Sequence, residues 1–404
     1  MNNEMTICIA GKNNIAVTVA EYILKEYKEV TLIACCNATD NGKNGFQRSF
    51  KSFCTQHQVP VKKLEELYSI SNLIFLSLEY DRIIRPSNFL TEKLYNIHFS
   101  YLPAYKGMYT SALPILNSET YTGVTLHKID VGIDTGDIIA QKKIEILQDF
   151  SGQDLYLKYI EEGTKLVIEN IENILNNKII AIPQSSFQSS YYSKKTIDYT
   201  NLRIDTNKTA FEIQSQIRAF TFPAYQLPII GGTKVYKSLI TNVKTDKKAG
   251  TIISETDFEL CIATIDYDLI LYKDLRDVLF ASAKDGNIEV LHKFIEEDYD
   301  IHQRSKEGWD IAMIAAYNGK YTYLEYLLNE KGWDINVVNN NGTTLLMYLM
   351  TDAATNNHIL SLKNFIDTYK PILHQKDYYG NDVFYYAEKY KNEKVIKLLK
   401  KYLK

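Results

Sequence analysis

The chain has 404 residues, which at roughly 150 residues per domain predicts two or three domains. Apolar residues make up 45% and charged residues 24%, and the formal net charge is −3. A globular protein is therefore expected, and nucleic acid and membrane surfaces are not expected as partners. No apolar run approaches the roughly 20 residues of a membrane span, no secretory signal is visible, and the five cysteines form no C-x-x-C pair. We expect a cytoplasmic protein without a cysteine metal site.

The first part of the chain alternates strand and helix signals. Apolar runs at 6–10, 30–36 and 73–78 predict strands, and the stretch 15–27 carries apolar residues at helical spacing. This alternation predicts an α/β domain with a mainly parallel sheet that is covered on both faces. A long helix is expected at 151–176, because its start, Ser-Gly-Gln-Asp, resembles a capping box.

Two further segments differ in character from the first. A helical stretch at 210–220 followed by a strand-rich part predicts a small α+β extension. Beyond it the sequence repeats itself: Gly308 and Gly342 are 34 residues apart, and other markers recur at 33 or 34. A period of this length with two helices per unit resembles the ankyrin repeat, which implies an all-α array of about four units with atypical first and last caps. The predicted domains are residues 1–183, 184–271 and 272–404.

Polar residues gather between residues 95 and 144. Asn96 and His98 alternate on a predicted strand, so both side chains are directed to one face of the sheet. The segment 130–137 follows another predicted strand and carries three carboxylates, among them Asp134. Open α/β sheets build their sites in loops after the carboxyl ends of parallel strands. We therefore expect a site here.

The arrangement N-x-H-x-S-x-L-P, then G-V-T-x-H, then D-x-G-x-D-T-G-D, resembles the folate-dependent formyltransferases. The resemblance covers roughly residues 5–240. It implies a Rossmann-like catalytic domain, N10-formyltetrahydrofolate as the formyl donor, and no metal. Asn96, His98 and Asp134 match the catalytic triad of that family. The cofactor-binding residues that the resemblance implies are Leu78, Tyr80, Asp81, Ile83, Asp130, Gly132 and Asp137.

The chemistry of the three side chains agrees with the resemblance. When an amine attacks the formyl carbon a tetrahedral oxyanion forms, and the Asn96 amide can donate to it. His98 can exchange protons or stabilise the oxyanion, and Asp134 can hold the imidazole or a catalytic water. A histidine on a strand is more often a packed core residue, and we expect that role for His57 and His127. A Ca²⁺ site in the acidic loop is disfavoured, because the spacing misses the EF-hand pattern.

Other segments indicate the formyl acceptor. Residues 216–225, Gln-Ile-Arg-Ala-Phe-Thr-Phe-Pro-Ala-Tyr, resemble the sugar-nucleotide N-formyltransferases, as do 106–110 and 190–194. The resemblance implies a dTDP-linked 3- or 4-amino-dideoxy sugar as the acceptor, for surface polysaccharide (O-antigen) biosynthesis, and a homodimer. A nucleotide base needs aromatic faces, and its diphosphate favours a helix N-terminus. The substrate-binding residues we expect are Lys12, Asn13, Ser77, Glu79 (as a partner for the amine), Tyr109, Tyr191, Tyr192, Phe220, Phe222 and Tyr225.

Two other functions stay open. The chain could be a catalytically idle scaffold that binds a partner through its ankyrin array, or a formyltransferase for another small amine. Transfer RNA is disfavoured, because the ankyrin-like array of this acidic chain stands where transfer-RNA enzymes carry a basic domain.

The ankyrin-like array is expected to bind a protein or a small ligand. Trp309 stands in a turn at the start of a unit, with Tyr317, Tyr321 and Tyr323 after it. An exposed tryptophan beside tyrosines can stack on a planar group such as a thymine base. Trp309 is therefore the candidate residue of a second ligand site, which could regulate the first.

Overall fold

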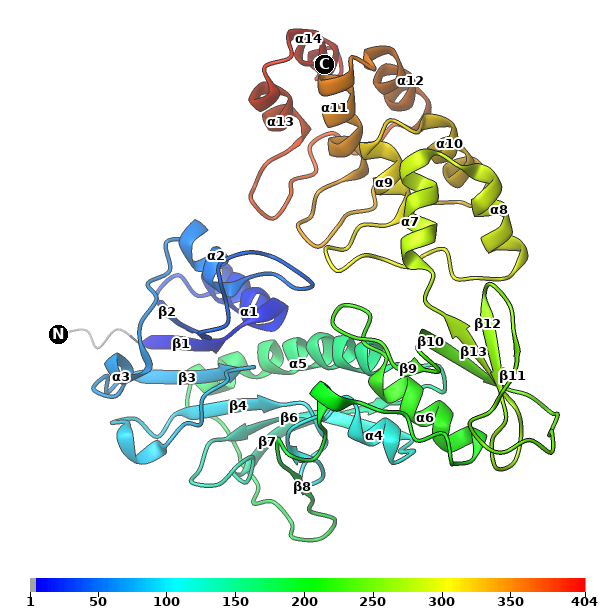
Figure 1. Cartoon of the computed structure of the whole chain (residues 1–404). Coiled ribbons are helices and arrows are strands. Elements are labelled where there is room, and N and C mark those ends of the chain that lie inside the picture. The colour runs from blue at the N-terminus through cyan, green and yellow to red at the C-terminus, as the bar shows by residue number, and fades with distance from the viewer. Residues whose placement is uncertain (1–4, 404) are drawn as a thin grey trace. The chain divides into compact units, whose positions relative to one another are not determined.

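The computed structural model describes residues 5–403 (Figure 1). These residues divide into two compact units. The larger unit spans residues 5–43 and 47–274, and the smaller spans 44–46 and 275–403. The predicted catalytic domain and extension thus lie together in the first unit, and each unit is described separately.

A six-stranded sheet with the order β2-β1-β3-β4-β6-β7 forms the centre of the first unit. The first four strands in this order are parallel, whereas β6 and β7 are antiparallel to their neighbours. The predicted α/β class with a mainly parallel sheet is confirmed. The strands are β1 (Thr6–Gly11), β2 (Thr31–Cys36), β3 (Leu73–Leu78), β4 (Leu94–His98), β6 (Tyr121–Lys128) and β7 (Ile138–Glu145).

Both faces of this sheet are covered, because alternate strand residues are apolar on either side. Ile7 and Ile9 of β1 pack in a core with α1 and α5, whereas Cys8 and Ala10 pack in a second core on the opposite face. The helices that contribute to these cores are α1 (Asn13–Glu26), α2 (Phe50–Gln56), α3 (Leu64–Leu67), α4 (Leu113–Leu116) and α5 (Gly152–Leu175).

The extension is a five-stranded antiparallel sheet with α6 packed against β10. The predicted boundary after residue 271 falls inside β13, which continues the sheet to Lys273. A separate two-stranded parallel ribbon joins β5 (Lys106–Gly107) to β8 (Tyr191–Tyr192). The elements of the extension are α6 (Ala210–Phe220), β9 (Ile229–Ile230), β10 (Thr233–Ile240), β11 (Ile252–Glu255), β12 (Glu259–Ile262) and β13 (Leu269–Lys273).

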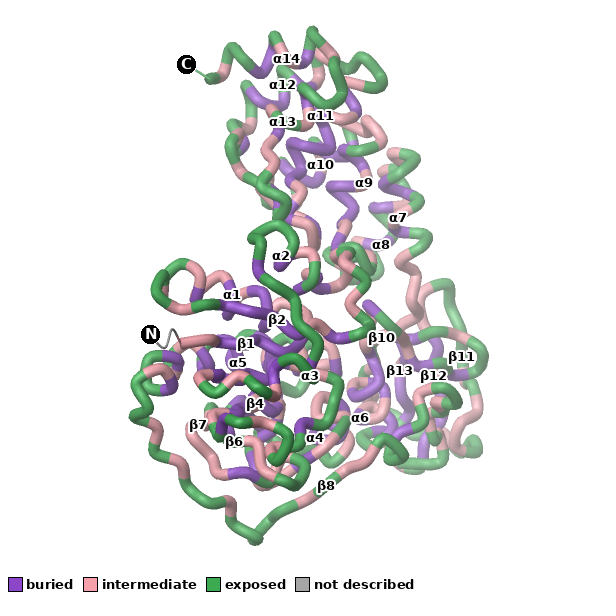
Figure 2. Tube along the Cα trace, turned by 90° about the vertical axis from the view of Figure 1, so that its left-hand side faces the viewer, coloured by how far each residue is buried: buried purple, intermediate pink, exposed green. Residues whose placement is uncertain are grey.

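The second unit consists, within the described residues, of four stacked helix pairs, as predicted. Each first helix packs against the first helix of the next pair, and Figure 2 shows buried residues concentrated along α9, α10 and α11. This nearest-neighbour packing is typical of a repeat array. The pairs are α7 (Arg276–Asp285) with α8 (Ile288–Glu296), α9 (Ile311–Tyr317) with α10 (Tyr321–Glu330), α11 (Leu345–Asn356) with α12 (Ile359–Tyr369), and α13 (Val383–Tyr390) with α14 (Glu393–Lys400).

The sequence predicted the start of the long helix α5 correctly. The long helix α5 begins after Ser151, whose hydroxyl accepts from the Asp154 backbone N–H at 3.2 Å, while Asp154 Oδ2 accepts from the Ser151 backbone N–H at 2.9 Å. This is the predicted capping box with aspartate in place of glutamate. None of the helices described is both long and apolar enough to cross a membrane.

Candidate active site

Asn96 and His98 lie on β4, where the strand ends at the carboxyl edge of the parallel part of the sheet. Tyr95 before them and Ile97 between them belong to the core beneath α1 and α5, so the polar pair is directed to the other face. His98 is 8% exposed. The sequence alternation therefore predicted the shared face correctly.

Asp134 lies between β6 and β7, in a loop that brings its carboxylate to both residues. Its Oδ2 is 3.5 Å from His98 Nδ1, and its Oδ1 accepts from Asn96 Nδ2 at 3.4 Å. The Gly107 backbone N–H donates to Oδ2 at 2.9 Å. Asp134 adopts φ +54°, a left-handed conformation that few residues other than glycine take up without support from neighbours. The three predicted catalytic residues are thus brought together.

The imidazole of His98 is anchored through one nitrogen. Nε2 lies 2.8 Å from the Tyr105 backbone carbonyl, which can only accept, so Nε2 carries a proton. In the neutral ring Nδ1 is then the basic nitrogen, and it faces Asp134. A proton taken up at Nδ1 would therefore be stabilised directly by the carboxylate.

Burial and charge set the protonation of this pair. Burial lowers the pKa of His98, and the Asp134 carboxylate partly offsets that effect. Burial would raise the pKa of Asp134, but the charge of a protonated His98 and the hydrogen bond from the Gly107 N–H outweigh it and hold the pKa at about 2. Near neutral pH the site thus holds a neutral imidazole beside an ionised carboxylate, which is the state a general base requires.

His127 belongs to this cluster, which the sequence did not reveal. It is directly opposite Asn96 across the β4–β6 pair, and its Nε2 lies 3.1 Å from Asn96 Nδ2 and 3.7 Å from Asp134 Oδ1. Its Nδ1 is 2.7 Å from the Lys128 carbonyl, so Nδ1 donates and Nε2 accepts from Asn96. The side chain is buried, as expected, but it orients a catalytic amide. The antiparallel register of β4 and β6 would have indicated this role, but a single sequence does not reveal the register.

The residues expected to bind the cofactor fall into two groups. The side chain of Leu78 is buried in one core of the sheet, and Tyr80 packs against the other. Ile83, in contrast, is 74% exposed, and Asp81 is exposed. In the acidic loop, Asp130 Oδ1 accepts from the Gly132 N–H and the Thr135 hydroxyl. The half-buried Asp137 completes this loop.

A partly buried polar network follows β1 and β3. Glu79 accepts from Asn13 Nδ2 at 3.0 Å and from the Tyr156 hydroxyl at 2.8 Å, and Gln47 donates to that hydroxyl. Burial raises the pKa of Glu79. Lys12, the residue before α1, is half-buried, and Ser77 lies opposite Asn96 on β3. Asn13 and Glu79 are thus contacting neighbours at the edge of the sheet that carries the triad.

The predicted aromatic residues do not form one surface. Phe220 is 6% exposed and packs against Tyr199. The expectation that it stacks on a base is wrong, because its ring belongs to the core of the first unit. Phe222 and Tyr225 form a tilted pair, with ring centroids 5.1 Å apart, and Tyr225 is 63% exposed. Tyr192 stacks on Tyr105, whereas Tyr191 is exposed. The Tyr109 hydroxyl donates to the Lys194 carbonyl.

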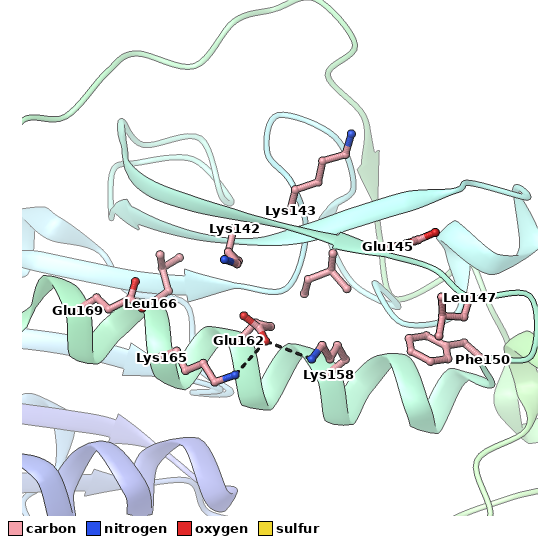
Figure 3. Close-up of a pocket in the computed structure, with 11 residues that line it drawn as sticks. Lys142, Lys143, Glu145, Leu147, Phe150, Lys158, Glu162, Lys165, Leu166 and Glu169 are labelled. Atoms are coloured by element: carbon pink, nitrogen blue, oxygen red, sulfur yellow. Dashed lines mark hydrogen bonds and ion pairs between the residues drawn. The ribbon is translucent and has the colours of Figure 1, made fainter.

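A cleft of about 540 Å³ lies between β7 and α5, away from the triad (Figure 3). Its walls carry charges of both signs that largely compensate one another: Glu162 pairs with Lys158 at 3.2 Å and with Lys165 at 3.1 Å. Such a lining of paired and solvated charges gives no preference for an anion or a cation.

In the second unit a cavity of about 450 Å³ is lined by Trp309. Trp309 is half-buried rather than fully exposed, because Tyr348 packs on it with ring centroids 4.3 Å apart. Tyr317 also lines the cavity, whereas Tyr323 is in the core. Tyr321 donates instead to the buried Asp352. Of the residues expected beside Trp309, only Tyr317 joins it.

The chain matches the formyl transferase family over residues 40–171, the formyl transferase C-terminal domain over 196–277, and ankyrin repeats (three copies) over 279–351. A solved N-formyltransferase from Helicobacter canadensis, in complex with folinic acid and dTDP-3-aminofucose, is 42% identical. The match covers 67% of this chain and 99% of that chain, with a TM-score of 0.62.

Two other relatives give the range of similarity. WlaRD, a sugar 3N-formyl transferase solved with dTDP and 5-N-formyl-THF, is 41% identical, with a TM-score of 0.63 and 67% and 98% of the two chains covered. The methionyl-tRNA formyltransferase of Clostridium beijerinckii is 27% identical over 62% of this chain and 85% of its own length. The chain belongs to the formyltransferase family. It is a formyltransferase that carries ankyrin repeats at its C-terminal end.

We expect the pKa of the His98 imidazole to lie below its ordinary value of about 6.5. Asp134→Asn should lower it further, because the removed carboxylate favours the imidazolium ion. A proton NMR titration of protein labelled with ¹⁵N-histidine measures both values, and His98→Asn identifies the signal. A higher pKa in the Asp134→Asn protein would contradict the electrostatic coupling.

Proposed function

We propose that this formyltransferase transfers the formyl group of N10-formyltetrahydrofolate to the amine of a dTDP-linked 3- or 4-amino-dideoxy sugar, for surface polysaccharide (O-antigen) biosynthesis. The observation that carries the proposal is the intact cluster of Asn96, His98 and Asp134 in a chain 42% identical to an enzyme solved with a dTDP-amino sugar. A non-catalytic scaffold would need none of these contacts. A cytoplasmic homodimer forms part of the proposal.

Each residue of the cluster has a part that its geometry supports. His98 Nδ1 accepts the proton that the acceptor amine loses, and the Asp134 carboxylate at 3.5 Å stabilises the resulting imidazolium ion. The imidazolium can return this proton to the donor nitrogen of the folate as its bond to the formyl carbon breaks, which restores the neutral ring. Asn96 Nδ2 donates at 3.1 Å to His127 and at a longer 3.4 Å to Asp134. The bond to Asp134 is the longer and therefore the weaker of the two. Asn96 can give it up and donate instead to the formyl oxygen, which develops negative charge during the transfer. Removing such a donor typically costs about 10²–10³ in rate.

The acidic loop fits a folate. A pteridine is flat, with an apolar face and amine groups that donate hydrogen bonds, and it therefore needs apolar contacts and acceptors. Val131 is 96% exposed and Ile133 40% exposed in this loop. They stand beside Asp130. The Gly132 N–H and the Thr135 hydroxyl both donate to its Oδ1, so Oδ2 is the oxygen that can accept from a ligand. When bound, the folate supplies the formyl carbon, while Asp130 and Asp137 hold its amine groups.

The alternative acceptor is transfer RNA, since curated relatives at 27% identity are methionyl-tRNA formyltransferases. A polyanion is bound through clusters of lysine and arginine. The formyl transferase C-terminal domain matches residues 196–277 and not the ankyrin array, so the expectation that the array replaces it was wrong. Residues 184–271, which hold most of this domain, carry ten Lys and Arg against nine Asp and Glu. This balance favours a small acceptor over a nucleic acid.

The decisive test is a panel of dTDP-amino sugars that differ in the position of the amine, assayed with N10-formyltetrahydrofolate. We expect turnover of a 3- or 4-amino sugar by the unaltered protein. His98→Asn and Asp134→Asn should each lower kcat by about 10²–10⁴, because general acid–base catalysis of this kind contributes that much. Circular dichroism should show that both variants keep the fold. Near-normal turnover in both variants would refute the assignment of the triad, and turnover of methionyl-tRNA alone would refute the acceptor.

Tyr225 and Phe222 are the aromatic residues that best fit a base-binding role, because their paired rings remain partly accessible beside Tyr156. Stacking on a base is worth about 1–3 kcal/mol. Tyr225→Ala and Phe222→Ala should therefore weaken dTDP binding by roughly 5- to 150-fold and folate binding much less. Calorimetric titration measures both affinities. Tyr267→Ala, an exposed tyrosine of the extension, is the matched control. The reverse ranking would place the nucleotide elsewhere.

A second ligand site in the ankyrin repeats is also part of the proposal. The cavity beside Trp309 combines aromatic walls, Tyr317, Tyr348 and Tyr386, with the side-chain amide of Asn341. Aromatic faces with hydrogen-bonding amides suit a planar base such as thymine. A ligand there could be the sugar nucleotide itself, or a protein could bind the array instead.

Two nucleotide sites per chain are expected by equilibrium dialysis with dTDP, and Trp309→Ala should leave one. The same change should alter the curvature of rate against sugar-nucleotide concentration, because coupling between two sites is typically about 1–3 kcal/mol. Leu360→Ala, an exposed apolar residue of α12 outside the cavity lining, serves as the control. If the unaltered protein binds only one dTDP per chain, the second site is refuted and the array is assigned to binding a protein partner.

A further inference from the structure

One segment, residues 184–190, holds two loops of the active site. The first is the loop at 105–107, which contacts both catalytic residues, and the second is the loop at 134–136, which carries Asp134. The Tyr105 carbonyl anchors His98, and the Gly107 N–H anchors Asp134. Both belong to one short loop. That loop is fixed by Ser190, whose hydroxyl accepts from the Tyr105 N–H at 2.8 Å and whose carbonyl accepts from the Lys106 N–H at 2.9 Å. Ser190 therefore supports the histidine side of the site.

Six residues earlier in the same segment, Gln184 holds the aspartate side. Its amide nitrogen Nε2 donates to the carbonyl of Asp134 and to that of Gly136, at 2.8 Å each. Both protons of the amide are thus used on the loop that carries the catalytic carboxylate. The backbone just before Gln184 is fixed as well, since Ile182 and Ile138 exchange two hydrogen bonds of 2.8 Å.

The carbonyl oxygen of the Gln184 side chain, in contrast, makes no hydrogen bond within the described residues. This atom, Oε1, is buried. A buried acceptor without a donor costs free energy. A hydrophobic side chain would avoid that cost, so the donors must matter more than the acceptor. They bind the two carbonyls on either side of Thr135, where the chain passes through the left-handed conformation of Asp134.

We propose that Gln184 is a positioning residue for catalysis: by holding the backbone of Asp134 and Gly136, it keeps the Asp134 carboxylate facing His98. The inference rests on the proposed roles of this pair. Without the two bonds the left-handed conformation at Asp134 is less well supported, and the loop can relax toward ordinary dihedral angles. A displacement of the carboxylate by about 1 Å is enough to cost about 10²-fold in rate.

The test compares Gln184→Met, which keeps length and volume but lacks the donors, with Gln188→Met, an exposed glutamine of the same segment. The Gln184 variant should lose about 10- to 100-fold in kcat with little change in KM. The Gln188 variant should match the unaltered protein. Gln184→Glu places a carboxylate against the two carbonyls and should lose activity to a similar extent. It replaces Gln184→Met in the test if the methionine variant does not fold.

A second readout needs no substrate. The pKa of His98 depends on the groups that face it: the Asp134 carboxylate raises it, while burial, His127 and Lys106 lower it. If the carboxylate moves away in Gln184→Met, the NMR titration of His98 should shift to lower pH, in the direction of Asp134→Asn and by less. This measurement stands even if the amino-sugar acceptor is wrong.

Three results would overturn the proposal. The first is a His98 titration that is unchanged in a folded Gln184→Met protein. The second is a loss of activity that follows only the folded fraction, which would make Gln184 a stabilising residue. The third is failure of both Gln184 variants to fold, which would assign the residue to the fold rather than to the geometry of the catalytic pair.

Discussion

The catalytic site depends on keeping one ionised carboxylate out of water. A largely buried carboxylate is costly unless hydrogen-bond donors surround it, and Asp134 meets this requirement through the Gly107 N–H and the Asn96 amide. Asn96 lies on β4 and Gly107 on β5, so the two donors come from different parts of the first unit. Their convergence explains why β4, the ribbon of β5 and β8, and the loop before β7 must be placed together, and why Asp134 is held in a conformation that glycine would adopt more readily.

The sequence was informative where local rules decide the structure. The strand Leu73–Leu78 and the helix Ala210–Phe220 were predicted with their observed bounds, because apolar runs and helical periodicity depend on neighbouring residues alone. Asn96 and His98 were recognised by alternation on one strand, and Asp134 through the motif. His127 and Gln184 were missed, since their places in the site depend on the register between strands and on a contact across fifty residues of chain. Phe220 was misjudged because aromatic character does not distinguish a binding surface from a core.

The binding side of the site is divided between a rigid part and an accessible part. Asn13, Glu79 and Tyr156 form a partly buried network whose members bond one another, so a ligand must either use their outer edges or exchange one of the bonds. Phe222 and Tyr225 contact this network through the ring of Tyr156, yet Tyr225 is largely exposed. A sugar nucleotide can thus meet a fixed polar end and an adaptable aromatic end, an arrangement that suits a small acceptor whose sugar must be oriented while its base is held mainly by stacking.

The cleft drawn in Figure 3 has a consequence for the newly made chain. Its upper wall is β7, which forms one edge of the six-stranded sheet. Ile182 pairs with this edge at Ile138. Where an edge strand is left uncovered, it presents backbone groups to any other extended chain and is a common starting point of aggregation. Lys142, Lys143 and Glu145 set successive charges along this edge, and Lys142 and Lys143 point to opposite sides of the strand. A second copy pairing here would have to bring lysines close together and remove them from water. The same charges that give the cleft no preference for a ligand thus protect the sheet from strand addition during synthesis.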